Sequence, residues 1–158
     1  MMNRPLTGIG ATYGHNKLLA DSYRRWTGRD LVQAAEHRGG MSLEEQLFTA
    51  PRVILSHGTE NDPVLNYGNR LALELWEMDW EQLTGTPSRL TAEPMERAER
   101  DQFFTQVTAN GYVDNYTGIR ISSSGRRFYI VKATVWNLVD EQGVYRGQAA
   151  TFLNYEYI

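Results

Sequence analysis

The sequence contains one local pair of side chains whose types could transfer a proton. His57 follows a short run of strand-forming residues, and Asp62 comes a few positions later in the same polar segment. A histidine beside a carboxylate can act as general acid and base, and a histidine in a pocket can bind haem iron. The competing interpretation is a turn histidine bonded to the backbone and an aspartate that forms a turn before Pro63. The other histidines, His15 and His37, lie in the N-terminal region, so no second histidine stands at metal-ligand spacing.

A second set of side chains could bind an anion or an amide group. Arg120, Arg126 and Arg127 flank a glycine turn, where they could hold an anion or could be solvated hairpin charges. Gln148 stands among small residues on a strand-like run, which leaves room for another group to approach. Asn137 lies in an apolar run, and a buried amide must find hydrogen-bond partners, so it locks a turn or contacts a ligand.

The candidate ligand contacts are aromatic, amide and cationic side chains, and none is assigned as catalytic or as a metal ligand. Trp136 has a competing interpretation as a core residue, and it points to the opposite strand face from Asn137. We expect both to lie near Gln148 in one buried cluster, because a tight turn over 140–143 joins their strands. The full candidate set is His57, Tyr67, Asn69, Trp76, Arg120, Tyr129, Trp136, Asn137 and Gln148.

The absence of cysteine excludes several classes of site. None of the 158 residues is a cysteine. Disulfides, thiolate metal sites, cysteine nucleophiles and chromophores attached through a cysteine sulfur are therefore ruled out. We predict that the protein forms no cysteinyl–flavin photoadduct.

Charge and hydropathy favour one globular domain. The net charge is −3 and 41% of the residues are hydrophobic, which suits a single domain with its own core. Charges of both signs are mixed along the chain, so no basic surface for nucleic acid or for a membrane is expected. No apolar run approaches the roughly 20 residues that span a bilayer, and none at the start would serve as a signal peptide. We expect a cytoplasmic protein.

Three antiparallel strands near the C-terminus are the clearest structural prediction. Residues 113–121, 127–139 and 144–152 are rich in β-branched and aromatic residues, and glycine-containing turns separate them. On the middle strand, simple alternation gives two sets of side chains, and both are rich in types that can be buried. One set is Phe128, Ile130, Lys132, Thr134, Trp136 and Leu138, and the other is Arg127, Tyr129, Val131, Ala133, Val135 and Asn137.

The preceding region predicts helices and two short strands that cover this sheet. A helix over residues 18–26 ends at Gly28, and residues 31–36 continue as a further turn or two. Ser42, Asn69 and Asp79 are each placed to cap a short helix. Short strands are expected over 52–56 and 63–67. A longer helix is expected over 94–110, with apolar contacts from Met95, Ala98, Phe103, Phe104 and Val107.

This order of elements predicts an α+β fold with a five-stranded antiparallel sheet, which is the order of the PAS fold. The early strand pair would lie beside the final strand, with the short helices on one face. We expect an N-terminal helical extension over 1–40 and a PAS-like domain over 41–158. The apolar stripe of the extension is larger than a free surface helix exposes, so it should pack on the outer sheet face or on a second protomer.

Several longer segments resemble the MEKHLA domain family, which is similar to PAS domains. The six-letter string that names the family is absent here, and the resemblance is carried by residues 19–29, 56–58, 62–63, 66–69, 87–89, 116–128, 135–138 and 147–152. The family occurs alone in bacteria and at the C-terminus of plant homeodomain–leucine-zipper regulators. The resemblance implies a sensory or regulatory module of the bacterial stand-alone form, and it carries no ligand or catalytic residue with it.

The favoured function is a sensory or regulatory domain that binds a small molecule or a regulatory protein and signals through ligand-dependent association. We expect a homodimer, with no nucleic-acid or membrane partner, and the sequence identifies no cofactor. Two alternatives stay open. One is a small cone-shaped α+β enzyme that uses His57 and Asp62 as an acid–base pair, and the other is a dimerisation module without a ligand.

Overall fold

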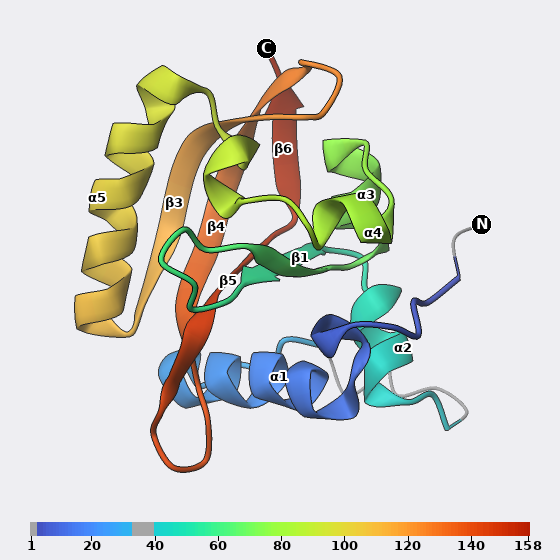
Figure 1. Ribbon diagram of the computed structural model, residues 1–158. Coiled ribbons are helices and arrows are strands. Elements are labelled where there is room, and N and C mark those ends of the chain that lie inside the picture. Colours follow the sequence, from blue (N-terminus) through green and yellow to red (C-terminus); the bar gives the residue numbers. More distant parts are fainter. Residues whose placement is uncertain (1–2, 33–39) are drawn as a thin grey trace.

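An antiparallel sheet forms the centre of the protein, and helices cover parts of both faces (Figure 1). The computed structural model describes residues 3–32 and 40–158, without the side chains of residues 94–96. The strand order is β2-β1-β5-β4-β3, and β6 pairs with β4 alone. The PAS-like α+β prediction is confirmed, with β6 as an unpredicted addition. The strands are β1 (Val53–His57), β2 (Leu65–Gly68), β3 (Tyr112–Ile121), β4 (Arg127–Val139), β5 (Tyr145–Phe152) and β6 (Asn154–Tyr157).

The helices begin where side-chain caps predict. Ser42, Asn69 and Asp79 each accept a hydrogen bond from a backbone N–H in the first turn, and Gly28 takes the left-handed conformation after α1. The turn predicted over 31–36 lies largely outside the described residues. No described helix is long and apolar enough to cross a membrane. The helices are η1 (Ile9–Ala11), α1 (Tyr13–Thr27), α2 (Leu43–Phe48), α3 (Arg70–Trp76), α4 (Trp80–Leu83), η3 (Ser88–Thr91) and α5 (Pro94–Asn110).

The serine-rich turn between β3 and β4 is tied to the end of α3. Glu77 closes this helix in the left-handed conformation, with φ 56°, and its carboxylate accepts hydrogen bonds from Ser122 and Ser124. Ser123 donates its hydroxyl to the Glu77 carbonyl at 2.7 Å and its backbone N–H to the Trp76 carbonyl at 3.0 Å. The turn therefore holds α3 against the sheet, on the face that also packs against α4 and is called the inner face below.

Each face of the sheet has its own layer of buried side chains. The inner layer joins α3 and α4 to the sheet, and α5 runs beside β3 at its edge (Figure 1). The outer layer joins α1 and α2 to the sheet and includes Leu19, Tyr23, Ile54, Trp136 and Leu138. The predicted N-terminal helix thus packs on the outer sheet face.

One bulge in β3 and one in β4 interrupt the pairing of these strands, and the bulge in β4 decides which of its side chains reach each layer. Asn115 in β3 and Lys132 in β4 both have positive φ, at 60° and 52°, and the strand register shifts by one residue at each. The alternation of β4 therefore changes at Lys132, which corrects the two sets predicted from simple alternation. The inner side chains of β4 are Phe128, Ile130, Ala133, Val135 and Asn137.

Candidate functional site

A small cavity lies under the inner face of the sheet, between β1, β4, β5, η3 and α5. Its volume is about 40 Å³, which is enough for about three water molecules. Apolar side chains line much of it, among them Leu55, Leu65, Ile130, Val135 and Phe152. Polar and cationic groups complete the lining, from His57, Ser88, Thr91, Arg100, Arg120 and Gln148.

Two buried arginines give the cavity its charge. Arg100 and Arg120 are each 5% exposed. Arg100 donates to the Ser88 hydroxyl, and its guanidinium lies over the Phe104 ring, 4.4 Å from the ring centroid. Arg120 donates to the Ile119 carbonyl at 2.8 Å and to the phenol oxygen of Tyr116 at 3.3 Å. Both guanidinium groups are therefore held by neutral partners inside the protein.

The positive charge of these arginines lacks a buried counter-charge. Asp101 contacts Arg100 at 3.3 Å, but its side chain is 70% exposed, and no carboxylate belongs to the described cavity lining. Burial and the neighbouring charge of Arg120 lower the pKa of Arg100 to about 10. Arg100 consequently stays protonated at neutral pH.

Gln148 and Asn137 join the sheet to the C-terminal turns of α5. They face each other across β5 and β4, and the Gln148 amide donates to the Asn137 side-chain oxygen at 3.1 Å. Gln148 also donates to the Thr108 hydroxyl at 2.9 Å, while Asn137 donates to the Val107 carbonyl at 3.1 Å. The two amides therefore position α5 against the cavity.

His57 reaches the cavity because Gly147 lets the end of β1 approach β5 closely. A Cβ atom on Gly147 would lie 2.0 Å from the His57 carbonyl oxygen, so no larger residue fits there. Burial lowers the pKa of His57, so the ring is neutral at pH 7. Its Nδ1 lies 2.9 Å from the Gly58 carbonyl, which places the proton on Nδ1 and leaves Nε2 as an acceptor.

A wider, open groove of about 390 Å³ lies next to the cavity on the solvent side. His57, Arg100, Phe104 and Gln148 line both spaces, so these four side chains separate the cavity from the groove. Asp62 lines the groove but not the cavity, and it forms an ion pair with Arg89. No described hydrogen bond or ion pair joins His57 to Asp62, so the acid–base pair is not assembled.

Trp76 lines the cavity and has an indole N–H without a partner among the described residues. Its ring packs edge-on against Phe128 and Phe152, with centroids 5.2 and 6.3 Å apart. The indole N–H is buried and has no hydrogen-bond acceptor. A buried polar group without a partner is uncommon, and a bound ligand or water is one explanation for it.

The structure brings together some of the predicted contacts and separates others. The cavity is lined by His57, Trp76, Arg120 and Gln148, and Asn137 supports Gln148 from behind. The other four lie elsewhere. Trp136 and Tyr67 belong to the outer layer, Tyr129 lies on the outer face, and Asn69 caps α3 while binding the Leu47 and Arg52 carbonyls.

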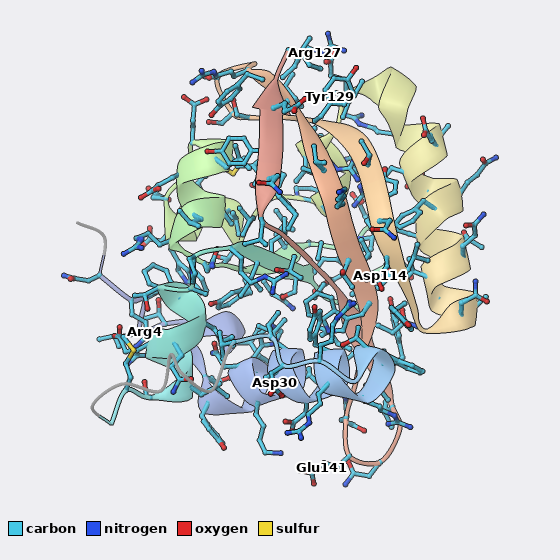
Figure 2. The ribbon with its side chains drawn as sticks, turned by 180° about the vertical axis from the view of Figure 1, so that it is seen from behind. Arg4, Asp30, Asp114, Arg127, Tyr129 and Glu141 are labelled. Atoms are coloured by element: carbon cyan, nitrogen blue, oxygen red, sulfur yellow. The ribbon has the colours of Figure 1, made fainter. Side chains whose placement is uncertain are left out.

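The bulge at Lys132 explains the separation on β4. It leaves Trp136 on the outer face, where its ring meets Tyr23 edge-on at 4.9 Å. Asn137 points to the opposite face, as expected for the next residue of a strand, so the predicted cluster of Trp136, Asn137 and Gln148 is reduced to the two amides. Tyr129 points away from the cavity and is 40% exposed beside the region that α1 leaves open (Figure 2).

Arg100, Ser88 and Phe104 were not among the predicted contacts. Arg100 and Phe104 are one helical turn apart on α5 and share a face of the helix. An arginine on the same face as a predicted apolar contact was the sequence signal that Arg100 is buried. Ser88 lies in the Pro87–Arg89 segment that carries part of the family resemblance, but its contact with Arg100 depends on the fold. The described residues contain no group of three or more acidic or histidine side chains that could hold a metal ion.

Comparisons with known proteins agree with this architecture. Among solved structures, a PAS domain from Colwellia psychrerythraea has a TM-score of 0.59 at 13% identity, covering 72% of this chain and 91% of that one. A light-oxygen-voltage domain studied with a flavin analogue has a TM-score of 0.58 at 16% identity, covering 75% and 86%. At these identities the likeness shows the PAS fold alone.

Two curated relatives are homeobox-leucine zipper proteins of Arabidopsis thaliana. ATHB-9 is 29% identical over 140 residues and ATHB-14 is 26% identical over 142 residues. The alignments cover 87% and 89% of this chain, which spans 17% of the length of each relative. The model of the MEKHLA domain matches residues 13–157, from the first residue of α1 to the end of β6. The chain therefore belongs to the MEKHLA domain family.

Proposed function

We propose that this chain is a sensory or regulatory module that binds a small molecule in the inner cavity and changes its association state in response. The observation that carries the proposal is the cavity itself. It is lined by apolar side chains and by buried groups that can hydrogen-bond, which is the usual composition of a ligand site. Its place between the sheet and α5 lets a bound molecule act on a helix.

The cavity favours a ligand smaller than the ring cofactors of larger pockets. Sites for drug-sized molecules typically enclose about 300–1,000 Å³. The volume of about 40 Å³ has no room for a flavin ring system unless α5 moves. Without cysteine, any flavin would also be held non-covalently.

The open part of the outer sheet face supports association with a second copy. α1 covers one end of this face, whereas the end formed by β3, β4 and β6 has no described helix over it (Figure 2). Tyr129 is exposed there, and β6 is an edge strand whose residues are all exposed. Exposed aromatic side chains and unpaired strand edges are common features of interfaces.

A regulatory partner is the second form of the same proposal. The plant relatives contain this segment within a longer homeobox-leucine zipper protein. A regulatory protein, attached or separate, would then bind the ligand-bound and ligand-free forms of the domain differently. We expect this chain to act in the cytoplasm, without contacting nucleic acid or a membrane. Mixed surface charges and the net charge of −3 support that expectation.

Native mass spectrometry of the purified full chain tests the proposal. We expect a dimer, and we expect a retained small molecule or a shift in the monomer–dimer equilibrium when a ligand is added. A dimer that retains no small molecule, and binds none that is added, would favour a pure dimerisation module. A monomer that retains no molecule and responds to none would contradict the proposal.

A further inference from the structure

The polar side of the inner cavity has the properties of an anion site. Each guanidinium has five N–H donors, and the described contacts of Arg100 and Arg120 use two on each. Two cations this deeply buried repel each other and are expensive to desolvate without an anion. Ser88 and Thr91 add hydroxyl groups to the same wall.

The rest of the lining restricts what kind of anion fits. Ile130, Val135 and Phe152 present hydrocarbon, which would not solvate a second charged end. The volume of about 40 Å³ limits the bound molecule to a few heavy atoms. A fully charged, tetrahedral ion such as phosphate would leave this apolar wall without a matching group.

Trp76 is a buried donor without an acceptor beside this cavity, and Trp136 and Tyr67 in the outer layer are also unpaired. Trp76 lines the cavity together with both arginines, and its Nε1–H finds no acceptor among the described atoms. Burying such a donor without a partner costs about 1–3 kcal/mol, and an anionic oxygen would satisfy it.

From these observations we propose that the cavity binds a short-chain carboxylate. Its carboxylate oxygens accept hydrogen bonds from Arg100 and Arg120, and its short hydrocarbon tail packs against Ile130 and Phe152. Arg is well suited to the planar, two-oxygen geometry of a carboxylate. This inference rests on the proposed function as a small-molecule sensor and names the ligand class.

The position of Arg100 gives binding a route to α5. Arg100 lies in the middle of that helix. Its guanidinium stacks on Phe104 at the boundary between the cavity and the open groove. A carboxylate that accepts from the remaining N–H donors of Arg100 adds a contact between the cavity and α5, so occupancy changes what holds the helix.

The first experiment compares acids with their neutral amides on the full chain. We would measure thermal unfolding with sodium acetate, propionate and pyruvate, against acetamide and propionamide, at constant ionic strength. At about 100 times Kd, propionate should raise Tm by about 5–10 °C, and propionamide should leave it unchanged. Equal stabilisation by propionamide, or by inorganic phosphate, would overturn the carboxylate assignment. So would a lack of response to all three acids.

The second experiment locates the bound acid. In proton–nitrogen spectra, propionate should shift the indole N–H resonance of Trp76. The indoles of Trp26 and Trp80 already donate to the carbonyls of Asn137 and Thr7 and should stay in place. Shifts of Trp26 or Trp80 without a shift of Trp76 would place the acid elsewhere and overturn the proposal.

Substitutions test the two arginines separately. Arg120→Gln and Arg100→Gln should each weaken propionate binding by about 10- to 100-fold, the loss expected for one charge-assisted contact. Arg24→Gln removes an exposed charge from α1 and should leave the affinity unchanged. If a glutamine variant does not fold, Arg120→Lys keeps the charge and should bind more weakly than the wild type. Unchanged affinity in the folded cavity variants would refute the site.

The outcomes also separate this inference from the proposed function. A neutral molecule retained in native mass spectra, together with no response to propionate, would leave a sensor with a different ligand class. A response to propionate without any change in association would support the site and contradict the signalling mechanism.

Discussion

The two faces of the sheet differ in how much empty volume and buried charge they contain, although β4 contributes to both. Under α1, Trp136 is fully buried against Tyr23, Trp26 donates to the Asn137 carbonyl, and Ser22 bonds both to the N–H and to the carbonyl of Val139. The inner face differs in having a cavity with two buried arginines around it, whereas a buried indole N–H without an acceptor among the described residues is found in both layers, at Trp76 and at Trp136.

This difference indicates a division of work between the layers. The outer face contributes close packing and the hydrogen bonds of Ser22 and Trp26, which stabilise the fold. The inner face contains buried charge that lowers stability unless something binds it. A domain whose outer layer is well packed can keep such a cavity and still fold, since total stability is only about 5–15 kcal/mol.

The largest expected effect comes from removing the outer layer. Deleting residues 1–40 removes α1 and exposes Ile54, Trp136 and Leu138, which it covers. We expect the truncated protein to aggregate and to lose cooperative thermal unfolding, measured by size-exclusion chromatography and circular dichroism. Deleting residues 1–3 alone should have no effect. A soluble, cooperatively folding fragment 41–158 would show that α1 is dispensable and would contradict the assignment of stability to the outer layer.

Single tryptophans compare the two layers directly. Truncating a buried tryptophan to alanine typically costs about 3–5 kcal/mol. We expect Trp136→Ala at the upper end of that range and Trp76→Ala at the lower end, because Trp76 borders a cavity and Trp136 does not belong to its described lining. Urea unfolding measures both free energies. A greater loss at Trp76 would reverse the assignment of stability to the outer face.

Each layer also contains one buried histidine, so both contribute to pH dependence. Burial lowers the pKa of His15 in the outer layer from 6.5 to about 4. Between pH 6.5 and 4 the unfolded chain therefore binds more protons, so stability is fully present above pH 6.5 and falls as the pH drops. The total loss from His15 is about 3 kcal/mol.

Replacing His15 by glutamine tests this linkage. Glutamine can still bond to Ser56, whose hydroxyl lies 3.0 Å from His15 Nε2, so the variant should show a shallower decline in unfolding free energy from pH 6.5 to 4. Some decline should persist, because burial also lowers the pKa of His57. An identical pH profile in the variant would mean that His15 is not the titrating group.

The smallest effects separate structural hydrogen bonds from functional ones. Gln148→Leu in the inner layer and Ser22→Ala in the outer layer should each cost on the order of 1 kcal/mol. Only Gln148→Leu should also weaken ligand binding, because Gln148 lines the cavity. Thermal unfolding and propionate titration of both variants provide the comparison. Normal binding in Gln148→Leu would leave this amide a structural residue that positions α5.

The fold was predictable because local signals agreed with the tertiary structure. The caps at Ser42, Asn69 and Asp79 and the glycine turns mark the elements, and the longest helix was predicted with its observed bounds. Ala98, expected as an apolar contact of that helix, is exposed instead, and Met95 lies among the undescribed side chains. The short strand β6 carried too weak a pattern to be predicted.

The site was less predictable because it depends on contacts between distant segments. Arg100 pairs with Ser88 across a loop, and nothing in the sequence near either residue indicates that contact. Trp136 was grouped with the amides because the hairpin brings their segments together, whereas the face that it takes depends on positive φ at Lys132, which cannot be foreseen from residue types. His57, Trp76, Arg120 and Gln148 were among the predicted contacts and line the cavity, and their role in binding a ligand stays a prediction.

The bulge at Lys132 matters for anyone who transfers residue roles between members of this fold. A relative with an unbulged strand can be aligned to β4 without a gap, and every position beyond Lys132 would then be assigned to the wrong side. Trp136 would be counted as a pocket residue and Val135 as a surface one. A one-residue gap placed at Lys132 restores the correspondence, so structure-guided alignment is needed before mutations are copied from one protein to another.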